Sequence, residues 1–244
     1  MKLSVIIPCK NEEGNIIKLH DKLKNVLKNK EYELIYIDDG STDNTLVELK
    51  EIYNKDKKHI KILSFSRNFK KDAAMYAGLE YSCGKYTCII DGDLQQNPKY
   101  LLDMMDFLDN NINYDEVAMV MRNRDKESKI MSFFKKSFYK LINKLSDTYF
   151  EENASDFRMF RENIKESVLS LKEHNRFSKG IFSWVGFKIK YIPYEVEKRN
   201  TGKSSFGFIN NLKYAFNGII DFSVKPLRLS IVLGIFSIII SFIY

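Results

Sequence analysis

Residues 86–93 read YTCIIDGD, a short apolar run that ends in two aspartates separated by one glycine. Similar apolar runs, each followed by polar turn residues, recur along the first half of the chain and alternate with stretches of helical apolar spacing. This alternation predicts an α/β fold with a parallel or mostly parallel sheet and helices on both of its faces. The strands that we expect are 3–8, 33–39, 60–65, 86–91 and 117–121.

The polar residues of this half of the chain gather where the expected strands end. Pro8–Glu12, Asp38–Ser41 and Asp91–Asp93 each lie at or just after the end of such a strand. Ligands of sheets of this kind bind beyond the carboxyl ends of the strands. Asp39 is a carboxylate at that edge and can accept hydrogen bonds from the N–H groups of a nucleoside base.

Asp91 and Asp93 indicate a metal site. The bend at Gly92 lets both carboxylates approach one ligand, and Gln95 offers an amide oxygen close by. Hard oxygen ligands suit Mg²⁺ or Mn²⁺, which commonly bridges carboxylates and phosphates. Asp-x-Asp pairs are also common in capped loops, but the position of this pair beside a second acidic strand end favours the metal interpretation.

The excess of basic residues is local. The chain has 39 Lys and Arg against 32 Asp and Glu, a formal net charge of +7. Residues 122–144 hold eight of the basic residues and only two acidic ones, and apolar residues recur there with helical spacing. A basic amphipathic segment over 122–145 suits a membrane interface. A core-packed helix with a solvated lysine face is the alternative.

The C-terminal residues carry no charge after Arg228. A full membrane span needs about 20 apolar residues, so we expect 226–244 to be a transmembrane helix that is cut short. A buried C-terminal helix is the alternative. Lys225 and Arg228 precede the apolar run, and the positive-inside rule then leaves a catalytic domain over 1–225 in the cytosol, at the inner (cytoplasmic) membrane.

Several classes of site are disfavoured by what the sequence lacks. Three cysteines in 244 residues do not form a disulfide scaffold. No G-x-G-x-x-G follows an expected strand and no G-x-x-x-x-G-K-S/T occurs, which disfavours dinucleotide oxidoreductases and P-loop NTPases. No nucleic-acid-binding motif accompanies the positive charge. His20, His59 and His174 have no second histidine at ligand spacing, so we expect them to be solvated.

The motifs together resemble family 2 glycosyltransferases. The segments that carry the resemblance are VIIPCKNEEGNI (5–16), YIDDGSTDNT (36–45), SFSRNFKKDAAMYAGL (64–79), IIDGDLQQNP (89–98), SDFRMF (155–160), NRFSKGIFSWVGF (175–187) and RNTGKSS (199–205). Within the family they are most similar to the polyprenyl-phosphate branch, the bactoprenol glucosyltransferases and dolichol-phosphate mannose synthases. The resemblance implies a GT-A fold, a nucleotide-diphosphate sugar donor, a divalent metal ion and a polyprenyl phosphate acceptor in the membrane.

The resemblance also assigns roles to individual residues. The residues that match the nucleotide-binding loops are Pro8, Asn11, Glu12, Asp39 and Asp91. The implied metal ligands are Asp91, Asp93 and Gln95. The positions implied to be catalytic, by binding metal, phosphate or sugar, are Asp93, Asp156, Arg122, Arg124 and Arg199. The further positions implied to contact phosphate are Lys136, Lys203 and Ser204. Asp156 is expected in a loop over the sugar.

Two positions depart from the family pattern. Ser205 stands where the family usually has lysine, and Lys203 is the nearest candidate to replace it. Lys70 stands where glycine is usual after Asn68 and Phe69.

The resemblance implies a reaction in which a lipid phosphate attacks the anomeric carbon of the donor sugar and the configuration inverts. A lipid phosphate is already anionic at neutral pH, so this reaction needs cations more than it needs a general base. Glucose as the sugar and UDP as the nucleotide are favoured. Two alternatives stay open: a transferase acting on a carbohydrate acceptor, and a membrane-tethered module that binds anionic lipid. Whether the chain forms a homo-oligomer is also open.

Overall fold

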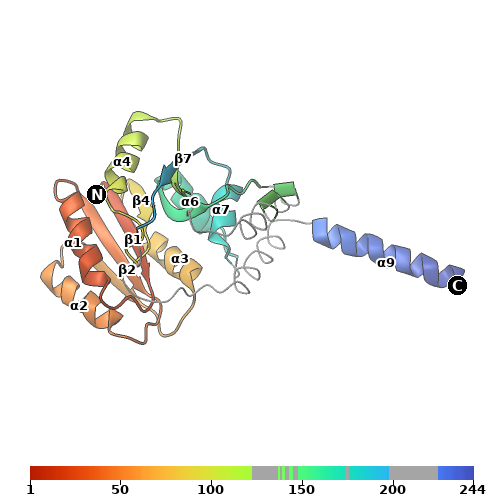
Figure 1. The fold of residues 1–244 in the computed structure, drawn as a ribbon, viewed down its shortest axis with the longest axis horizontal. Helices are drawn as coiled ribbons and strands as arrows, with labels where there is room; N and C mark the ends of the chain where they lie inside the picture. Colours follow the sequence, from red (N-terminus) through yellow and green to blue (C-terminus); the bar gives the residue numbers. More distant parts are fainter. Residues whose placement is uncertain (123–136, 138, 141–142, 145–147, 174–175, 198–224) are drawn as a thin grey trace. The chain divides into compact units, whose positions relative to one another are not determined.

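The computed structural model describes residues 1–122, 137, 139–140, 143–144, 148–173, 176–197 and 225–244 (Figure 1). The chain divides into two compact units. The first comprises Met1–Asp125 and Asn153–Lys203, and the second comprises Lys126–Glu152 and Ser204–Tyr244. The sheet and the candidate site belong to the first unit.

A seven-stranded sheet forms the centre of the first unit, in the order β3-β2-β1-β4-β6-β5-β7. Only β6 runs antiparallel to its neighbours, so the sheet is mostly parallel, as predicted. The strands are β1 (Leu3–Cys9), β2 (Tyr32–Asp38), β3 (Ile60–Ser64), β4 (Tyr86–Ile89), β5 (Glu116–Met121), β6 (Ala154–Arg161) and β7 (Ile189–Tyr194).

The helices of this unit connect and cover the strands. They are α1 (Ile16–Leu27), α2 (Thr45–Lys55), α3 (Lys71–Tyr81), α4 (Tyr100–Asn110), α6 (Glu162–Ser170) and α7 (Ser178–Trp184). All five predicted strands are confirmed, with ends that differ by one or two residues. The α/β prediction for the first half is therefore confirmed, whereas β6 and β7 were not predicted.

The core has two layers because β1 and β2 are buried on both faces. Leu3, Val5 and Ile7 of β1 pack in one cluster with the apolar face of α1. On the opposite face, α3 approaches Ile6 so closely that a Cβ atom at Gly78 would collide with it. Figure 1 shows α1 and α3 on opposite sides of these strands. Continuous apolar runs are what strands buried on both faces require.

The chain leaves the sheet after β5 and returns to it at β6. Val120 of β5 pairs with Ala154 of β6, and the N–H of Met121 donates to the carbonyl of Asn153 at 3.1 Å. The residues between Met121 and Asn153 therefore begin and end side by side at one edge of the sheet. Most of the predicted basic segment, 122–145, lies outside the described residues.

One helix of the second unit is described, α9 (Lys225–Ile243). Every large apolar side chain between Ile231 and Ile243 is half or more exposed. Within the described part of the chain, no helix reaches the length and apolarity that crossing a membrane requires. The structure therefore does not support the predicted transmembrane helix over 226–244.

The histidines differ from the prediction in one case. His20 is buried on α1 rather than solvated, and its Nδ1 lies 3.4 Å from the hydroxyl of Tyr36. His59 is half-buried and lies 2.7 Å from a carboxylate oxygen of Asp56. His174 lies outside the described residues. The helical spacing of α1 placed apolar residues on its buried face, but spacing alone did not reveal that Tyr36 offers a polar partner there.

Asp109, near the end of α4, provides a test of how this unit responds to acid. Its carboxylate accepts hydrogen bonds from Lys2 Nζ at 2.8 Å and from the Tyr86 hydroxyl at 2.7 Å. These two donors, Lys2 first, lower the pKa of Asp109 to about 2. A depressed folded-state pKa stabilises the fold above the ordinary aspartate value, and that stabilisation is lost as the pH falls through the folded-state value.

We therefore expect Asp109→Asn to lower the melting temperature at pH 7. The difference from the unsubstituted protein should shrink as the pH falls from about 4 to about 2. Thermal melts followed by circular dichroism across this range check the prediction. A difference that stays constant down to pH 2 would show that the charge of Asp109 contributes nothing.

Candidate active site

The predicted site residues converge at one edge of the sheet. Asn11, Asp39 and Asp91 follow the parallel strands β1, β2 and β4, whose carboxyl ends share this edge. Asp156 reaches the same edge from β6, because β6 runs antiparallel and Arg158 pairs with Ile89 at the end of β4. Asp156 therefore lies on a strand, not in the loop that was expected.

The loops after β1 and β2 are tied together by side chains. Asn11 has a φ of 53°, a left-handed conformation that asparagine tolerates better than most residues. Its Oδ1 accepts the N–H of Thr42 at 2.9 Å, and its own N–H donates to Ser41 Oγ at 3.0 Å. The N–H of Glu12 donates to Thr45 Oγ1 at 2.8 Å. Asn11 and Glu12 thus help to fix the two loops against each other.

Asp39 is buried at the end of β2, and this burial raises its pKa. Its Oδ1 accepts the N–H of Phe69 at 2.6 Å. Gly40 makes this approach possible, because it has a φ of +61° and a Cβ there would lie 2.5 Å from the carbonyl carbon of Arg67. Lys10 donates to the carbonyls of both Asp39 and Gly40 at 3.0 Å.

Lys70 is the strained residue of the site. It precedes α3 with φ 77° and ψ 162°, a region that is essentially restricted to glycine. This conformation explains physically why glycine suits the position. It also fixes the direction in which α3 begins, and hence where the next side chain, Lys71, can reach.

Lys71 bridges two of the carboxylates. Its Nζ lies 2.5 Å from Asp91 Oδ1 and 2.7 Å from Asp156 Oδ2. Burial alone would lower the pKa of Lys71, but the two carboxylates outweigh it and raise that pKa above its ordinary value. Burial would likewise raise the pKa of Asp156, but Lys71 and Lys179 hold it well below the usual range.

Sequence reasoning did not identify Lys71. No local pattern marks this lysine, because its partners Asp91, just after β4, and Asp156, on β6, are separated from it in the sequence. Lys179 was missed for the same reason. It lies in α7, and its Nζ donates to the carbonyl of Ala154 at 3.0 Å.

Gln96, which the sequence analysis did not single out, orients Asp91. Its Oε1 accepts the N–H of Asp91, and its Nε2 donates to Asp91 Oδ2, both at 2.9 Å. The same Nε2 also donates to Ser155 Oγ at 3.2 Å. Both carboxylate oxygens of Asp91 therefore receive an N–H donor, one from Lys71 and one from Gln96.

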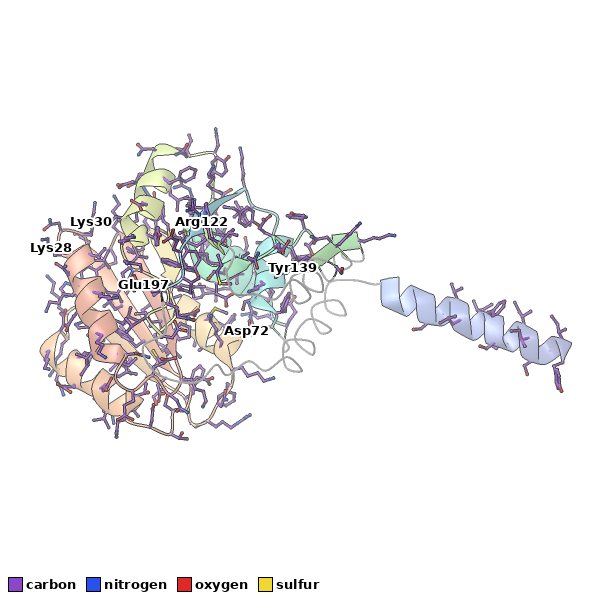
Figure 2. All side chains as sticks on the ribbon, viewed as in Figure 1. Lys28, Lys30, Asp72, Arg122, Tyr139 and Glu197 are labelled. Carbon is purple, nitrogen blue, oxygen red and sulfur yellow. The ribbon has the colours of Figure 1, made fainter. Side chains whose placement is uncertain are left out.

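Asp93 is 7% exposed, and its Oδ1 accepts the N–H of Gln95 at 3.1 Å. The Gln95 carbonyl accepts the N–H of Glu197 at 2.9 Å. Glu197, labelled in Figure 2, also accepts from Asn97 at 2.5 Å and from Lys22 at 3.2 Å. The segment after β7 is thereby fastened to the loop that carries Asp93.

Of the predicted cationic residues, the described part of the chain includes only Arg122. Arg122 lies just after β5, is largely exposed, and its guanidinium is 3.7 Å from Glu195 (Figure 2). The remaining predicted cationic and phosphate-contacting residues lie outside the described residues: Arg124, Lys136, Arg199, Lys203 and Ser204. Pro8, by contrast, is described within β1.

The donor set suits a divalent ion whose coordination is completed by a substrate. Within the described residues no cluster of three or more His, Cys, Asp or Glu could bind a metal. Mg²⁺ and Mn²⁺ are, however, commonly held by one or two carboxylates that are completed by substrate phosphates. Asp91 and Asp93 fit that requirement.

Comparison with known proteins agrees with this geometry. Residues 4–169 match the model of Glycosyl transferase family 2. CsbB of Bacillus subtilis (strain 168), named as a glycosyltransferase, is 39% identical over 99% of this chain and 73% of its own length. The bactoprenol glucosyl transferase of Shigella phage SfV is 34% identical over 100% of this chain and 79% of its own.

Among solved structures, glucosyl-3-phosphoglycerate synthase from Mycobacterium tuberculosis in complex with UDP is similar in fold. The TM-score is 0.64 at 20% identity, covering 89% of this chain and 80% of that one. The fold is that of a GT-A glycosyltransferase. The chain belongs to glycosyl transferase family 2.

The strain at Lys70 gives a test of the local geometry. We expect Lys70→Gly to stabilise the protein by about 1–3 kcal/mol, since glycine adopts the observed backbone conformation without cost. Urea denaturation measures the change. Lys28, labelled in Figure 2, is the matched control, because it ends α1 with an ordinary φ of −48° and Lys28→Gly should bring no gain. Equal effects of the two substitutions would contradict the assignment of strain to Lys70.

Proposed function

We propose that the protein transfers a hexose, with glucose favoured, from a nucleotide-diphosphate sugar to a polyprenyl phosphate such as undecaprenyl phosphate. The observation that carries the proposal is the acidic sheet edge of Asp39, Asp91, Asp93 and Asp156, in a chain that aligns over its whole length with a bactoprenol glucosyl transferase. UDP is the favoured nucleotide. The product is a lipid-linked sugar for modification of the cell envelope.

The donor would bind across the ends of β1, β2 and β4. Asp39 would accept from the base, and the loops joined at Asn11 and Glu12 would form the floor of the nucleoside site. Pro8 ends the apolar part of β1 beneath it. Asp91 lies where the ribose and diphosphate would follow. The relative order of these residues along the sheet edge, β2-β1-β4, supports this orientation of the donor.

Asp91, Asp93 and Gln95 would hold a divalent ion, Mg²⁺ or Mn²⁺, which would stabilise the negative charge of the leaving diphosphate as a Lewis acid. The chain's own residues position the reactants. Gln96 fixes the orientation of Asp91. We further propose that Arg122, together with the other predicted cations, holds donor or acceptor phosphates.

Asp156 favours a phosphate acceptor over a carbohydrate hydroxyl. A hydroxyl acceptor requires a general base, whose pKa is best placed near the operating pH. The pKa of Asp156 is instead well below its ordinary range, because Lys71 and Lys179 outweigh the effect of its burial. Such a carboxylate is a weak base but a good orienting group for a sugar hydroxyl. An anionic lipid phosphate, attacking with inversion, needs no base.

We propose that α9 attaches the protein to the lipid bilayer. Its exposed apolar residues do not form a stripe but fall on all sides of the helix between Ile231 and Ile243. A helix that is apolar all round belongs in a protein core or in a membrane. Lys225 and Arg228 at its start suit anionic lipid headgroups. This attachment would place the catalytic unit at the cytoplasmic membrane.

The transfer itself is tested with the full chain in detergent, labelled nucleotide sugars, Mn²⁺ or Mg²⁺ and undecaprenyl phosphate. We expect label to move into organic-extractable lipid with UDP-glucose. No lipid-linked label with any common nucleotide sugar would refute the proposed function.

Asp93→Asn should reduce this transfer by about 100-fold or more, because it removes a carboxylate that would hold the divalent ion, and with it the charge that would stabilise the leaving diphosphate. Asp106→Asn, an exposed residue of α4, is the matched control and should retain full activity. A wild-type rate for Asp93→Asn at limiting metal would show that Asp93 does not bind the ion.

Membrane attachment is tested by flotation with vesicles that contain anionic lipid. The double substitution Ile235→Asp and Ile239→Asp should abolish flotation of the protein. Val47→Asp, at an exposed apolar residue of α2, should leave it unchanged. If the doubly substituted protein still floats with the vesicles, α9 does not attach the protein to the membrane.

A further inference from the structure

We propose that Lys71 is a tethered counter-cation that competes with the divalent ion for Asp91, so that the ion binds tightly only together with the diphosphate of the nucleotide. This inference rests on the proposed nucleotide-sugar site but concerns a residue to which neither the motifs nor the relatives assign a role. It makes Lys71 a positioning residue that acts through Asp91 and Asp156.

The geometry places the ammonium group on the carboxylate that a metal ion would need. Lys71 Nζ is 2.5 Å from Asp91 Oδ1, and Gln96 occupies Oδ2 at 2.9 Å. The side chains of Lys71, Asp91 and Asp156 are 30%, 29% and 18% exposed. The bridge is therefore open to solvent, and an ion that enters from outside meets a carboxylate that is already neutralised.

The backbone on both sides of Lys71 is fixed, so the ammonium group cannot drift away with its segment. The N–H of Phe69, two residues earlier, donates to Asp39 at 2.6 Å. Asp72, the next residue and labelled in Figure 2, accepts the N–H of Ser178 at 2.9 Å. Only the flexible four-carbon stem of Lys71 remains to move.

The competition follows from charge. A divalent ion and an ammonium group held a few ångströms apart repel each other strongly in a partly desolvated site. An ion bound at Asp91 and Asp93 must therefore displace Lys71 or accept that repulsion. A nucleoside diphosphate brings new negative oxygens, which can complete the ion's coordination and also receive the displaced ammonium group.

The bridge has a second effect in the absence of substrate. Asp91, Asp93 and Asp156 place three carboxylates at one edge of the sheet, and like charges so close together repel. Lys71 holds Asp91 and Asp156 together until the donor arrives. The same residue thus keeps the unliganded site assembled and opposes its occupation by the ion alone.

The test is a Mn²⁺ titration of the full chain in detergent without nucleotide, with free Mn²⁺ measured by electron paramagnetic resonance. We expect Lys71→Met to bind Mn²⁺ about tenfold more tightly than the unsubstituted protein. Lys71→Gln should behave like Lys71→Met, and Lys71→Arg, which keeps the charge, should stay close to wild type. A gain in affinity is a result that structural damage would not produce.

Lys61→Met is the matched control. Lys61 also pairs with a buried carboxylate, Glu33, at 2.7 Å, but it does so on β2 and β3, away from the site. The Mn²⁺ affinity of the Lys61→Met protein should equal that of the wild type. Thermal melts of all variants establish that each is folded.

Unchanged or weaker Mn²⁺ binding in both folded Lys71 variants that lack the charge would overturn the inference. Calorimetry on the same samples measures UDP binding in the presence of Mn²⁺. It distinguishes failure of the role of Lys71 from failure of the proposed function. A wild-type chain that binds no nucleotide contradicts the nucleotide-sugar site itself. A chain that binds UDP, with Mn²⁺ affinity indifferent to Lys71, contradicts only the role of Lys71.

Discussion

The charge balance at the carboxyl edge of the sheet is the constraint on which the rest of the site depends. Three carboxylates approach one another there, and their repulsion would open the edge unless cations were built in beside them. Lys71 supplies the central cation, and the strained backbone at Lys70 directs the start of the helix that carries it. The residues on either side of Lys71 are anchored to Asp39 and to the start of α7, which connects the end of β2 with the helix that carries Lys179.

The first half of the fold could be read from the sequence because its signals are local. Each strand up to Met121 is an apolar run closed by turn residues, and each acidic strand end is visible in the sequence itself. The second half departs from this alternation. β6 enters the sheet antiparallel between β4 and β5, and no local pattern specifies which strands it joins. The resemblance placed Asp156 in a loop, and no strand pattern in the sequence corrected this; the partnership of Lys71 with Asp156 on β6 was likewise not foreseen.

The site residues divide in the same way, between those marked by local sequence signals and those that depend on tertiary partners. Asp39, Asp91 and Asp93 were found because they stand directly after apolar runs. Gln95 was predicted as a further metal ligand, whereas the hydrogen bonds from Gln96 to Asp91 depend on the folded loop and were not foreseen. His20 was predicted on the surface, although a buried hydroxyl on β2 satisfies it. Spacing predicts which side of an element is buried, whereas hydrogen-bond partners depend on the tertiary fold.

The N–H of Met121 donates to the carbonyl of Asn153, so the chain rejoins the sheet next to the point where it leaves. This arrangement affects how related sequences can vary. The sheet holds the two ends of the segment between Met121 and Asn153 together. The entropic cost of closing such a segment changes little when residues are inserted or deleted. The length and composition of the segment can therefore change without altering the register of β5 and β6. The segment between them is in this sense free to vary, while the pairing of β4 and β5 with β6, the strand that carries Asp156, stays under strict geometric control.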